Sequence, residues 1–244
     1  MSTRIRYIAE PTHVQEVSLR GTADLGFWQS QLADEDLVPV EHGGKAQILI
    51  VAATMRYMAM RFTEVSFSVL LSGGDKQPTG GGAFLVQAFS SSRPFAFIER
   101  ALFAAPYSHA VCRVSVAPPS SIQIARGGKT IFRAEMSQIP NAPEKPDHIE
   151  EDGWEGPVFL PRNGNPRREG CMFFVRIRGR ARTCPFMRTD DTLFLAPSPA
   201  PGVFQTLLDS QFAATEWVVR EDATHGKSKT YRRSEGLRDR RTSA

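Results

Sequence analysis

Apolar and polar residues alternate along short stretches of this chain, in the way expected for half-buried β-strands. Residues 62–71 read FTEVSFSVLL, and residues 83–90 form a second such stretch after the glycine-rich segment SGGDKQPTGGG. Two matched stretches joined in this way predict an antiparallel hairpin. The alternation places Glu64 on one face with Ser66 and Ser68. A carboxylate among small polar side chains is typical of a residue that points into a polar cavity.

Further strands follow from the same kind of pattern. An apolar run flanked by Gly43-Gly44 predicts a buried strand at 46–54, and the glycine pair inside IQIARGGKTIFRAEM predicts a hairpin tip at 127–128. Other strand-like stretches lie at 110–116, 120–125, 171–184, 191–197 and 216–221.

Three segments instead show helical spacing. A helix is predicted near 23–34, with Thr22 or Asp24 as its cap, and another at 203–214. The third begins after serines 90–92, because Ser is a favoured cap and Pro94 is tolerated in the first turn.

This third helix carries an apolar stripe of Phe95, Ile98 and Leu102, and it must end near Ala105 because Pro106 follows. Many short strands with a few helices predict an α+β fold, with a predominantly antiparallel, barrel-like core and peripheral helices. The stretch 141–165 is rich in Pro, Gly and acidic residues, and it is interpreted as a linker or a long crossing loop.

Composition narrows the class of protein. The chain has 244 residues, of which 41% are hydrophobic, which is typical of a globular protein. The longest apolar run, 46–55, is too short to span a bilayer, and the N-terminus lacks the apolar core of a signal peptide. We therefore expect a cytoplasmic protein with no membrane partner. Three widely spaced cysteines predict free thiols rather than a disulfide framework.

The positive charge is concentrated at one end. Residues 225–244 contain seven basic and two acidic residues, while the whole chain has a net charge of +4, so residues 1–224 carry about −1. We expect a single domain at 1–224, followed by a basic, disordered tail. Because the folded part is not basic, a nucleic-acid partner is not expected.

The candidate chemistry lies around the predicted hairpin and the helix that follows it. Glu64, Tyr107 and His109 are candidate catalytic residues, because consecutive elements are usually neighbours in space. Arg61 and Arg93 are candidates to bind a substrate carboxylate, since a guanidinium matches a carboxylate bidentately. Ser108 is a further candidate substrate-binding residue. No metal-ligand spacing or nucleotide-binding loop appears, so no cofactor or metal is expected.

Each catalytic candidate also has a purely structural interpretation. Glu64 pairs with a strand arginine, Tyr107 is a core ring whose hydroxyl bonds to the backbone, and His109 is a surface or capping residue. The residue types alone do not decide between the two interpretations.

The order of elements resembles the acetoacetate decarboxylase superfamily over roughly residues 20–136. In that family a Y-x-E segment precedes the hairpin, and here it is matched by Phe62-Thr63-Glu64. The family's helix then ends in a G-R-E-I-x-G-x-P-K-K motif, matched here by the segment from Arg100 to Ser108. The resemblance implies the family's fold, a cavity for a small molecule, and a role for Glu64 as the family's carboxylate.

The chain departs from that motif at its most important position. The resemblance implies that the first lysine after the proline forms a Schiff base with a β-keto acid, but Tyr107-Ser108 stand there. This Pro-Tyr pair resembles a divergent branch of the superfamily. We therefore do not expect decarboxylation through an imine. Lys129, which opens a predicted strand, is the lysine to test as a replacement, and we expect it to be exposed.

Three functional hypotheses follow. The first is a lyase- or isomerase-type enzyme that acts on a small oxo- or carboxylate-bearing molecule without a Schiff-base lysine. The second is a non-catalytic module that binds a small ligand on the same fold. The third, ranked last, is nucleic-acid binding through the basic tail. Exposed β edges would favour homo-oligomers.

Overall fold

The protein has an α+β fold dominated by antiparallel sheet, as the sequence predicts. A computed structural model describes residues 5–73, 81–137, 148–162, 169–197 and 202–235. The helical elements are α1 (Leu25–Leu32), the 3-10 turn η1 (Ala33–Glu35), α2 (Arg93–Phe103) and α3 (Val203–Asp209). The strands are β1 (Tyr7–Ala9), β2 (Val14–Asp24), β3 (Glu41–His42), β4 (Lys45–Tyr57), β5 (Met60–Leu71), β6 (Gly82–Ser90), β7 (Tyr107–His109), β8 (Val111–Ser115), β9 (Ser121–Arg126), β10 (Lys129–Glu135), β11 (His148–Phe159), β12 (Cys171–Pro185), β13 (Thr192–Leu195), β14 (Ala213–Ser228) and β15 (Tyr231–Arg232).

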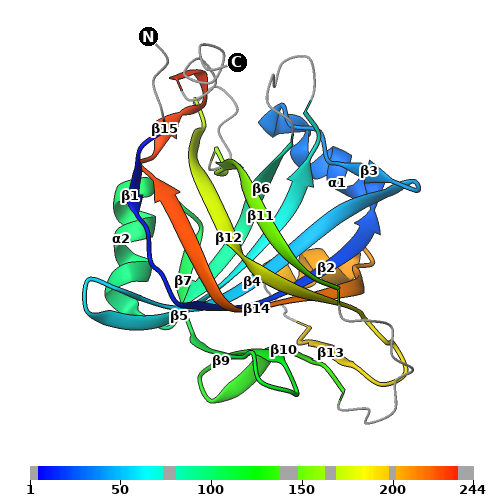
Figure 1. Cartoon of the computed structure of the whole chain (residues 1–244). Helices are drawn as coiled ribbons and strands as arrows, with labels where there is room; N and C mark the ends of the chain where they lie inside the picture. The colour runs from blue at the N-terminus through cyan, green and yellow to red at the C-terminus, as the bar shows by residue number, and fades with distance from the viewer. Residues whose placement is uncertain (1–4, 74–80, 138–147, 163–168, 198–201, 236–244) are drawn as a thin grey trace.

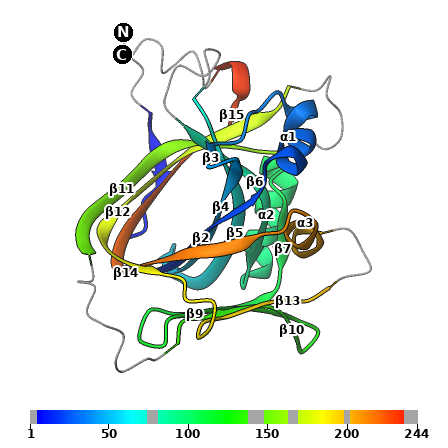
Figure 2. The same ribbon diagram turned by 90° about the vertical axis from the view of Figure 1, so that its right-hand side faces the viewer.

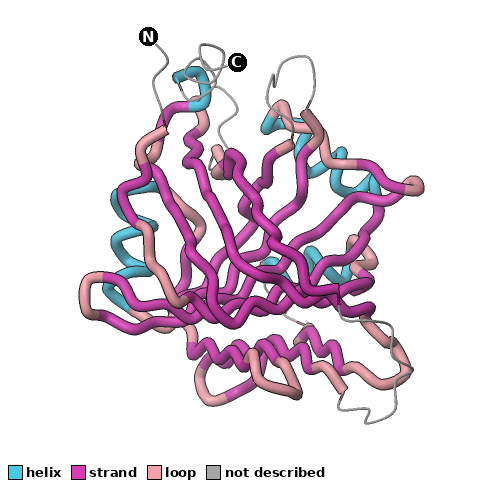
Figure 3. The backbone as a smooth tube through the Cα atoms, viewed as in Figure 1, coloured by secondary structure: helices cyan, strands magenta, loops and turns pink. Residues whose placement is uncertain are grey.

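The largest sheet closes on itself. Its strands run in the order β14-β2-β4-β5-β6-β11-β12, and β12 pairs again with β14, which completes a barrel-like ring. The pairs around the ring are antiparallel except for β6 with β11. The strong curvature of β11, β12 and β14 around the ring is visible in Figure 2, and Figure 3 shows how much of the chain is strand.

A smaller sheet packs beneath the ring. Its order is β13-β10-β9-β8, and it lies below the large sheet in Figure 1. Phe67 of β5 makes edge contacts with Phe132 of β10 and Phe204 of α3, at ring-centroid distances of 5.4 and 5.6 Å. These buried rings belong to one apolar cluster, which joins the small sheet and α3 to one face of the ring.

The helices begin where the sequence predicts. Asp24 caps α1 by accepting a hydrogen bond from the backbone N–H of Phe27, and Ser92 caps α2. The two helices lie on opposite sides of the molecule in Figure 1. Within the described residues, none of the helices combines the length and apolar character needed to cross a membrane.

The packing of α2 differs from the one its sequence favours. Ile98 and Leu102, which form the apolar stripe, are 43% and 73% exposed, whereas Ala96 and Glu99 are buried. The inward face of α2 thus carries a glutamate, and its polar contact is described below.

Three boundaries predicted from the sequence are wrong. The helix predicted at 203–214 ends at Asp209, and the chain is already in β14 from Ala213. Residues 148–159 form β11, which pairs with β12 along its whole length, although this composition is typical of a loop. The domain does not end at residue 224, because β14 continues to Ser228 and the chain then forms β15. The basic tail is therefore folded up to residue 235, and residues 236–244 lie outside the described part of the chain.

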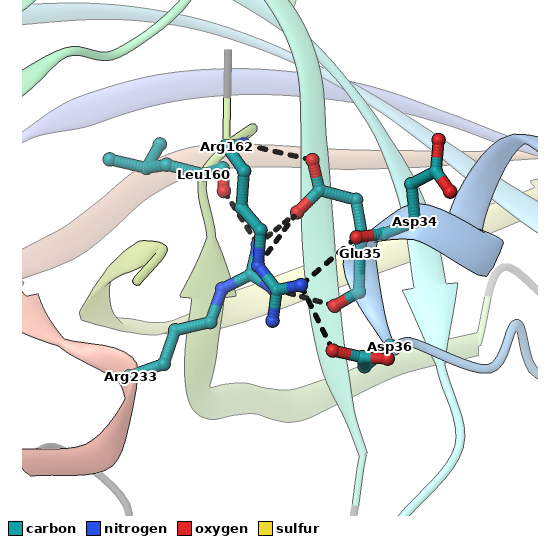
Figure 4. A network of polar contacts seen from close by, with 6 residues as sticks. All are labelled: Asp34, Glu35, Asp36, Leu160, Arg162 and Arg233. Atoms are coloured by element: carbon teal, nitrogen blue, oxygen red, sulfur yellow. Dashed lines mark hydrogen bonds and ion pairs between the residues drawn. The ribbon is translucent and has the colours of Figure 1, made fainter. Parts of the chain in front are cut away.

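A buried ion pair fixes this C-terminal segment (Figure 4). The Arg233 guanidinium donates to the Glu35 carboxylate at 2.6 Å and to the backbone carbonyls of Glu35 and Leu160 at 2.7 Å. The backbone N–H of Arg162 donates a hydrogen bond to the same carboxylate, and the Arg162 side chain donates one to the carboxylate of Asp36. The Arg233 guanidinium thus joins the segment after β15 to η1 and to Leu160, the residue after β11.

Replacing Arg233 with Met should lower the free energy of unfolding by about 3–5 kcal/mol, because Glu35 loses its main buried partner. Urea denaturation measures the change. The neighbouring Arg232 is exposed, so Arg232→Met is the matched control and should change stability by less than about 1 kcal/mol. Equal effects of the two substitutions would contradict the assigned role of this ion pair.

Candidate functional site

Strand register places a row of residues on the polar face of the ring. Glu16 of β2 lies opposite Ala53 of β4, Ala53 lies opposite Glu64 of β5, and Glu64 lies opposite Ser90 of β6. Residues directly opposite one another point to the same face of a sheet. Glu64 therefore points away from the apolar cluster around Phe67, as the alternation in its sequence predicts.

Tyr107 reaches Glu64 from a different element. Its hydroxyl donates a hydrogen bond to Glu64 Oε1 at 2.7 Å. The helix α2 ends at Phe103, the following Ala104 adopts a left-handed conformation, and the extended segment β7 begins at Tyr107, directly after Pro106. This segment pairs in parallel with residues 88–90 of β6, whereas β11 pairs with β6 only at residues 83–84. The proline that ends the helix thus delivers Tyr107 to the part of β6 that β11 does not cover.

Lys227, which lies in the predicted basic tail, also belongs to this cluster. Lys227 of β14 forms an ion pair with Glu99 of α2, and its ammonium lies over the ring of Phe173 at 4.7 Å. The rings of Phe103 and Tyr107 lie 5.7 and 5.9 Å from the same nitrogen. Since β14 and β5 are not neighbours in the sheet, these side chains meet across the interior of the ring.

Burial shapes the protonation of this cluster. Desolvation raises the pKa of Glu64 above its ordinary value, against the opposing effects of the Lys227 charge and the Tyr107 hydrogen bond. Desolvation, together with the carboxylates of Glu64 and Glu99, raises the pKa of Tyr107 well above its ordinary value. Tyr107 is therefore a neutral hydrogen-bond donor at neutral pH, and burial increases the proton affinity of the Glu64 carboxylate.

A second buried polar group lies beside the first one. Glu16 is fully buried and is contacted by Arg220, by His225 Nε2 at 2.7 Å and by the Ser18 hydroxyl at 2.7 Å. Burial on its own would raise the pKa of Glu16, but these partners outweigh it and lower that pKa to about 2. The charge of His225 also lowers the pKa of Glu64. The cluster around Glu16 therefore lies close enough to Glu64 to affect it electrostatically.

Of the candidates named from the sequence, the structure pairs Glu64 with Tyr107 only. His109 is half-buried and shares a face with Tyr107, but it lies beyond Ser90 in the row, two strands from Glu64. Strand spacing makes that separation about 10 Å between backbones. His109 is therefore not part of the hydrogen-bonded pair of Glu64 and Tyr107.

The remaining candidates lie elsewhere. Ser108 is within 3.3 Å of Gln87 Nε2, and it points to the opposite face of β7 from Tyr107. Arg93 is exposed at the start of α2, and Arg61 is exposed opposite Arg56 near the tip of the β4–β5 hairpin. The alternation of β5 puts Arg61 on the face opposite Glu64. Lys129 is exposed, as expected.

Lys227 and Glu99 are the functional candidates that sequence reasoning missed. Glu99 lies beside the apolar stripe of Phe95, Ile98 and Leu102, and a single acidic residue at that place in a helix gives no sign of burial. Lys227 and His225 are two residues apart, as strand residues on one face must be. However, Thr224, Gly226 and Ser228 around them give no apolar alternation, so the pattern does not separate this stretch from a tail.

Comparisons with known proteins find the fold but no sequence relative. No protein-family model matches the chain, and no curated protein matches its sequence. A solved acetoacetate decarboxylase matches with a TM-score of 0.64 and 14% identity, over 94% of this chain and 90% of that one. The acetoacetate decarboxylase from Legionella pneumophila matches with a TM-score of 0.60 and 16% identity, over 93% and 89%.

A third similar structure is the enduracididine biosynthesis enzyme MppR. It was solved in complex with the condensation product of pyruvate and imidazole 4-carboxaldehyde, and it matches with a TM-score of 0.59 and 9% identity over 95% of this chain and 90% of that one. At these identities the likeness is one of fold. It confirms the acetoacetate decarboxylase-like fold that the order of elements predicts.

Replacing Tyr107 with Phe should raise the pKa of Glu64 further, because the lost hydrogen bond stabilises the ionised carboxylate. The ¹³C carboxyl shift of Glu64, assigned with Glu64→Gln, would report that pKa. Tyr57, whose hydroxyl bonds to the carbonyl of Ile8, supplies the control variant Tyr57→Phe. A Glu64 pKa that stays constant in Tyr107→Phe would show that this hydrogen bond is not formed in solution.

Glu16 should make the free energy of unfolding depend on pH in the acidic range. Because its pKa is lowered on folding, its stabilising contribution is fully present above about pH 4.5 and is lost as the pH falls toward 2. The shift corresponds to about 3 kcal/mol. Urea denaturation across this window should show the loss in the wild type and in Glu216→Gln, a variant of a surface carboxylate, but not in Glu16→Gln. Parallel curves for all three proteins would rule out this contribution.

Proposed function

We propose that this protein is an enzyme that moves a proton at the carbon next to the carbonyl of a small oxo acid, without a covalent imine. The observation that carries the proposal is the hydrogen-bonded pair of Glu64 and Tyr107 beside the Lys227 ammonium. These three residues bring a base, a neutral hydrogen-bond donor and a cation together in a buried environment. These are the three requirements for forming and stabilising an enolate.

The proposed reaction gives the base, the hydrogen-bond donor and the cation different roles. Glu64 as a carboxylate takes the proton from the carbon, and the electron pair of the C–H bond forms the C=C bond as the carbonyl electrons move to oxygen. The Tyr107 hydroxyl turns from Glu64 to donate to that oxygen. Lys227 holds the substrate carboxylate and offsets the added negative charge. The same Glu64 returns the proton to carbon, or exchanges it with water.

The raised pKa of Glu64 favours this role. A carboxylate with its ordinary pKa is a weak base at neutral pH, and desolvation increases its proton affinity. The raised pKa of Tyr107 keeps its proton in place, so the hydroxyl remains a donor. The uncharged donor and the base therefore keep different roles although they touch each other.

The ion pair with Glu99 argues against a Schiff base on Lys227. A lysine forms an imine through a free amine nitrogen, whereas the Lys227 nitrogen is held in contact with the Glu99 carboxylate. The position after Pro106, where the decarboxylases that this sequence resembles have their lysine, carries Tyr107. Lys227 is thus better suited to bind a carboxylate than to attack a carbonyl.

The similar structures support the class of substrate. MppR, which has the same fold, was solved as a complex with pyruvate, a small oxo acid. One buried oxygen of Glu99, Oε2, has no hydrogen-bond partner within the described residues. It is available to accept a hydrogen bond from a bound substrate or water, and this availability equally suits a protein that binds such a molecule without turning it over.

Exchange of carbon-bound protons with D₂O tests the proposal and separates it from simple binding. The wild type should exchange the methyl protons of pyruvate, or the protons next to the carbonyl in 2-oxobutyrate or acetoacetate, faster than buffer does, as followed by ¹H NMR. Glu64→Gln should slow the catalysed exchange by about a hundredfold or more, and Tyr107→Phe by about a hundredfold. Glu135→Gln, which changes a half-buried carboxylate of β10 in the small sheet, is the control and should leave the rate unchanged.

Other outcomes would contradict it. Saturable binding of an oxo acid with no exchange above buffer would favour the binding module. Borohydride reduction in the presence of each acid should leave the protein mass unchanged, and a reduced adduct on Lys227 or Lys129 would replace the proposed chemistry with an imine mechanism.

A further inference from the structure

The tip of the β4–β5 hairpin holds two arginines directly opposite each other. Arg56 of β4 is in register with Arg61 of β5, and both side chains are exposed. Like charges at directly opposite positions of a sheet are destabilising. Within the part of the chain that the structure describes, neither arginine has a carboxylate within ion-pair distance.

A depression of about 480 Å³ lies over this pair. Its lining is rich in hydrogen-bond donors and contains no carboxylate; the lining residues are His13, Gln15, Thr54, Arg56, Ala59 and Arg61. Gln15 is in register with Thr54, so the polar groups of β2, β4 and β5 continue the same face. One carboxylate lies at its edge, where Asp222 contacts His13 Nδ1 at 3.1 Å.

The turn that joins the two strands is also unusual. Tyr57 pairs with Met60, which leaves Met58 and Ala59 as a two-residue loop with φ angles of 47° and 64°. Glycine and asparagine are the residues that adopt this left-handed conformation most easily, and here neither is present. Non-glycine residues in such a conformation are frequent at functional sites. The turn fixes the register that holds Arg56 opposite Arg61.

We propose that this depression is a binding site for a phosphate group, carried by a small ligand or free in solution. A phosphate supplies the negative charge that the two guanidinium groups lack, and its oxygens match their paired N–H donors. The Thr54 hydroxyl and the Gln15 amide provide further donors. The depression is large enough for a small phosphorylated molecule.

This site is separate from the candidate catalytic cluster. Arg61 and Thr54 lie on the face of the sheet opposite Glu64, and the two groups share only the strands that carry them. The phosphate site therefore does not rest on the proposed enolisation, and the failure of one proposal leaves the other unaffected.

Calorimetric titration with inorganic phosphate and with glycerol 3-phosphate, at constant ionic strength set with chloride, tests the site. The wild type should bind at least one of them. Arg56→Gln and Arg61→Gln should each weaken that binding about tenfold, as expected for the loss of one charged partner. Arg100→Gln, an exposed arginine on α2, is the matched control and should bind as the wild type does. Tighter binding of glycerol 3-phosphate would indicate an organic ligand, and equal binding would indicate free phosphate.

Thermal melting without phosphate provides an independent readout. Each of the two variants should melt about 1–3 °C higher than the wild type, because the repulsion between the guanidinium groups is removed. The proposal is overturned if neither phosphate compound binds, or if both variants retain wild-type affinity. A lower melting temperature in both variants would show that the pair is not strained by its charges, and would also count against the site.

Discussion

The candidate site depends on the ion pair between Lys227 of β14 and Glu99 of α2. This ion pair joins β14, the last long strand of the ring, to α2, the helix that precedes β7. Two elements that are far apart in the sequence are thereby held together at the interior of the ring. The ion pair also places the positive charge of Lys227 beside the carboxylates of Glu99 and Glu64. Glu64 and Glu99 affect each other unfavourably, and Lys227 is the cation whose charge stabilises Glu64 in its ionised form. Buried charges persist in a fold only when they are paired in this way.

The rest of the architecture positions that ion pair. One face of the ring packs against α3 and the small sheet through Phe67 and its neighbours, and the other face carries Glu64 and Lys227 beside a smaller apolar cluster that includes Tyr107 and Phe173. Arg233 fixes the chain a few residues after Lys227 by its contacts with Glu35 and Leu160. Glu16, with Arg220 and His225, stabilises the same strand just before Lys227. The charged residues of β14 and its continuation therefore serve both stability and the chemistry proposed for the site.

The sequence predicts the parts of this arrangement that follow from local rules. Alternation in residues 62–71 places Glu64 on the polar face, and Pro106 ends the helix so that Tyr107 begins a new segment. Ser92 and Asp24 are recognisable as caps because a short polar side chain satisfies the free N–H groups of a helix start.

Other parts follow from contacts between distant segments and are not visible locally. Glu99 is buried instead of Ile98 and Leu102, because its partner Lys227 arrives from the far end of the chain. The same holds for β11, where pairing with β12 over its full length stabilises a strand in a sequence rich in acidic residues. Arg61 was named for its chemistry, but the pleat of β5 directs it away from Glu64.

The most direct test of the central claim is a crystal structure of the protein with oxalate, a planar dianion that resembles the enolate of pyruvate. We expect one carboxylate of oxalate to contact Lys227 Nζ and an oxygen of the other to accept a hydrogen bond from the Tyr107 hydroxyl beside Glu64. Oxalate bound away from these three residues, for example between Arg56 and Arg61, would contradict the assignment of this cluster as the place where an oxo acid reacts.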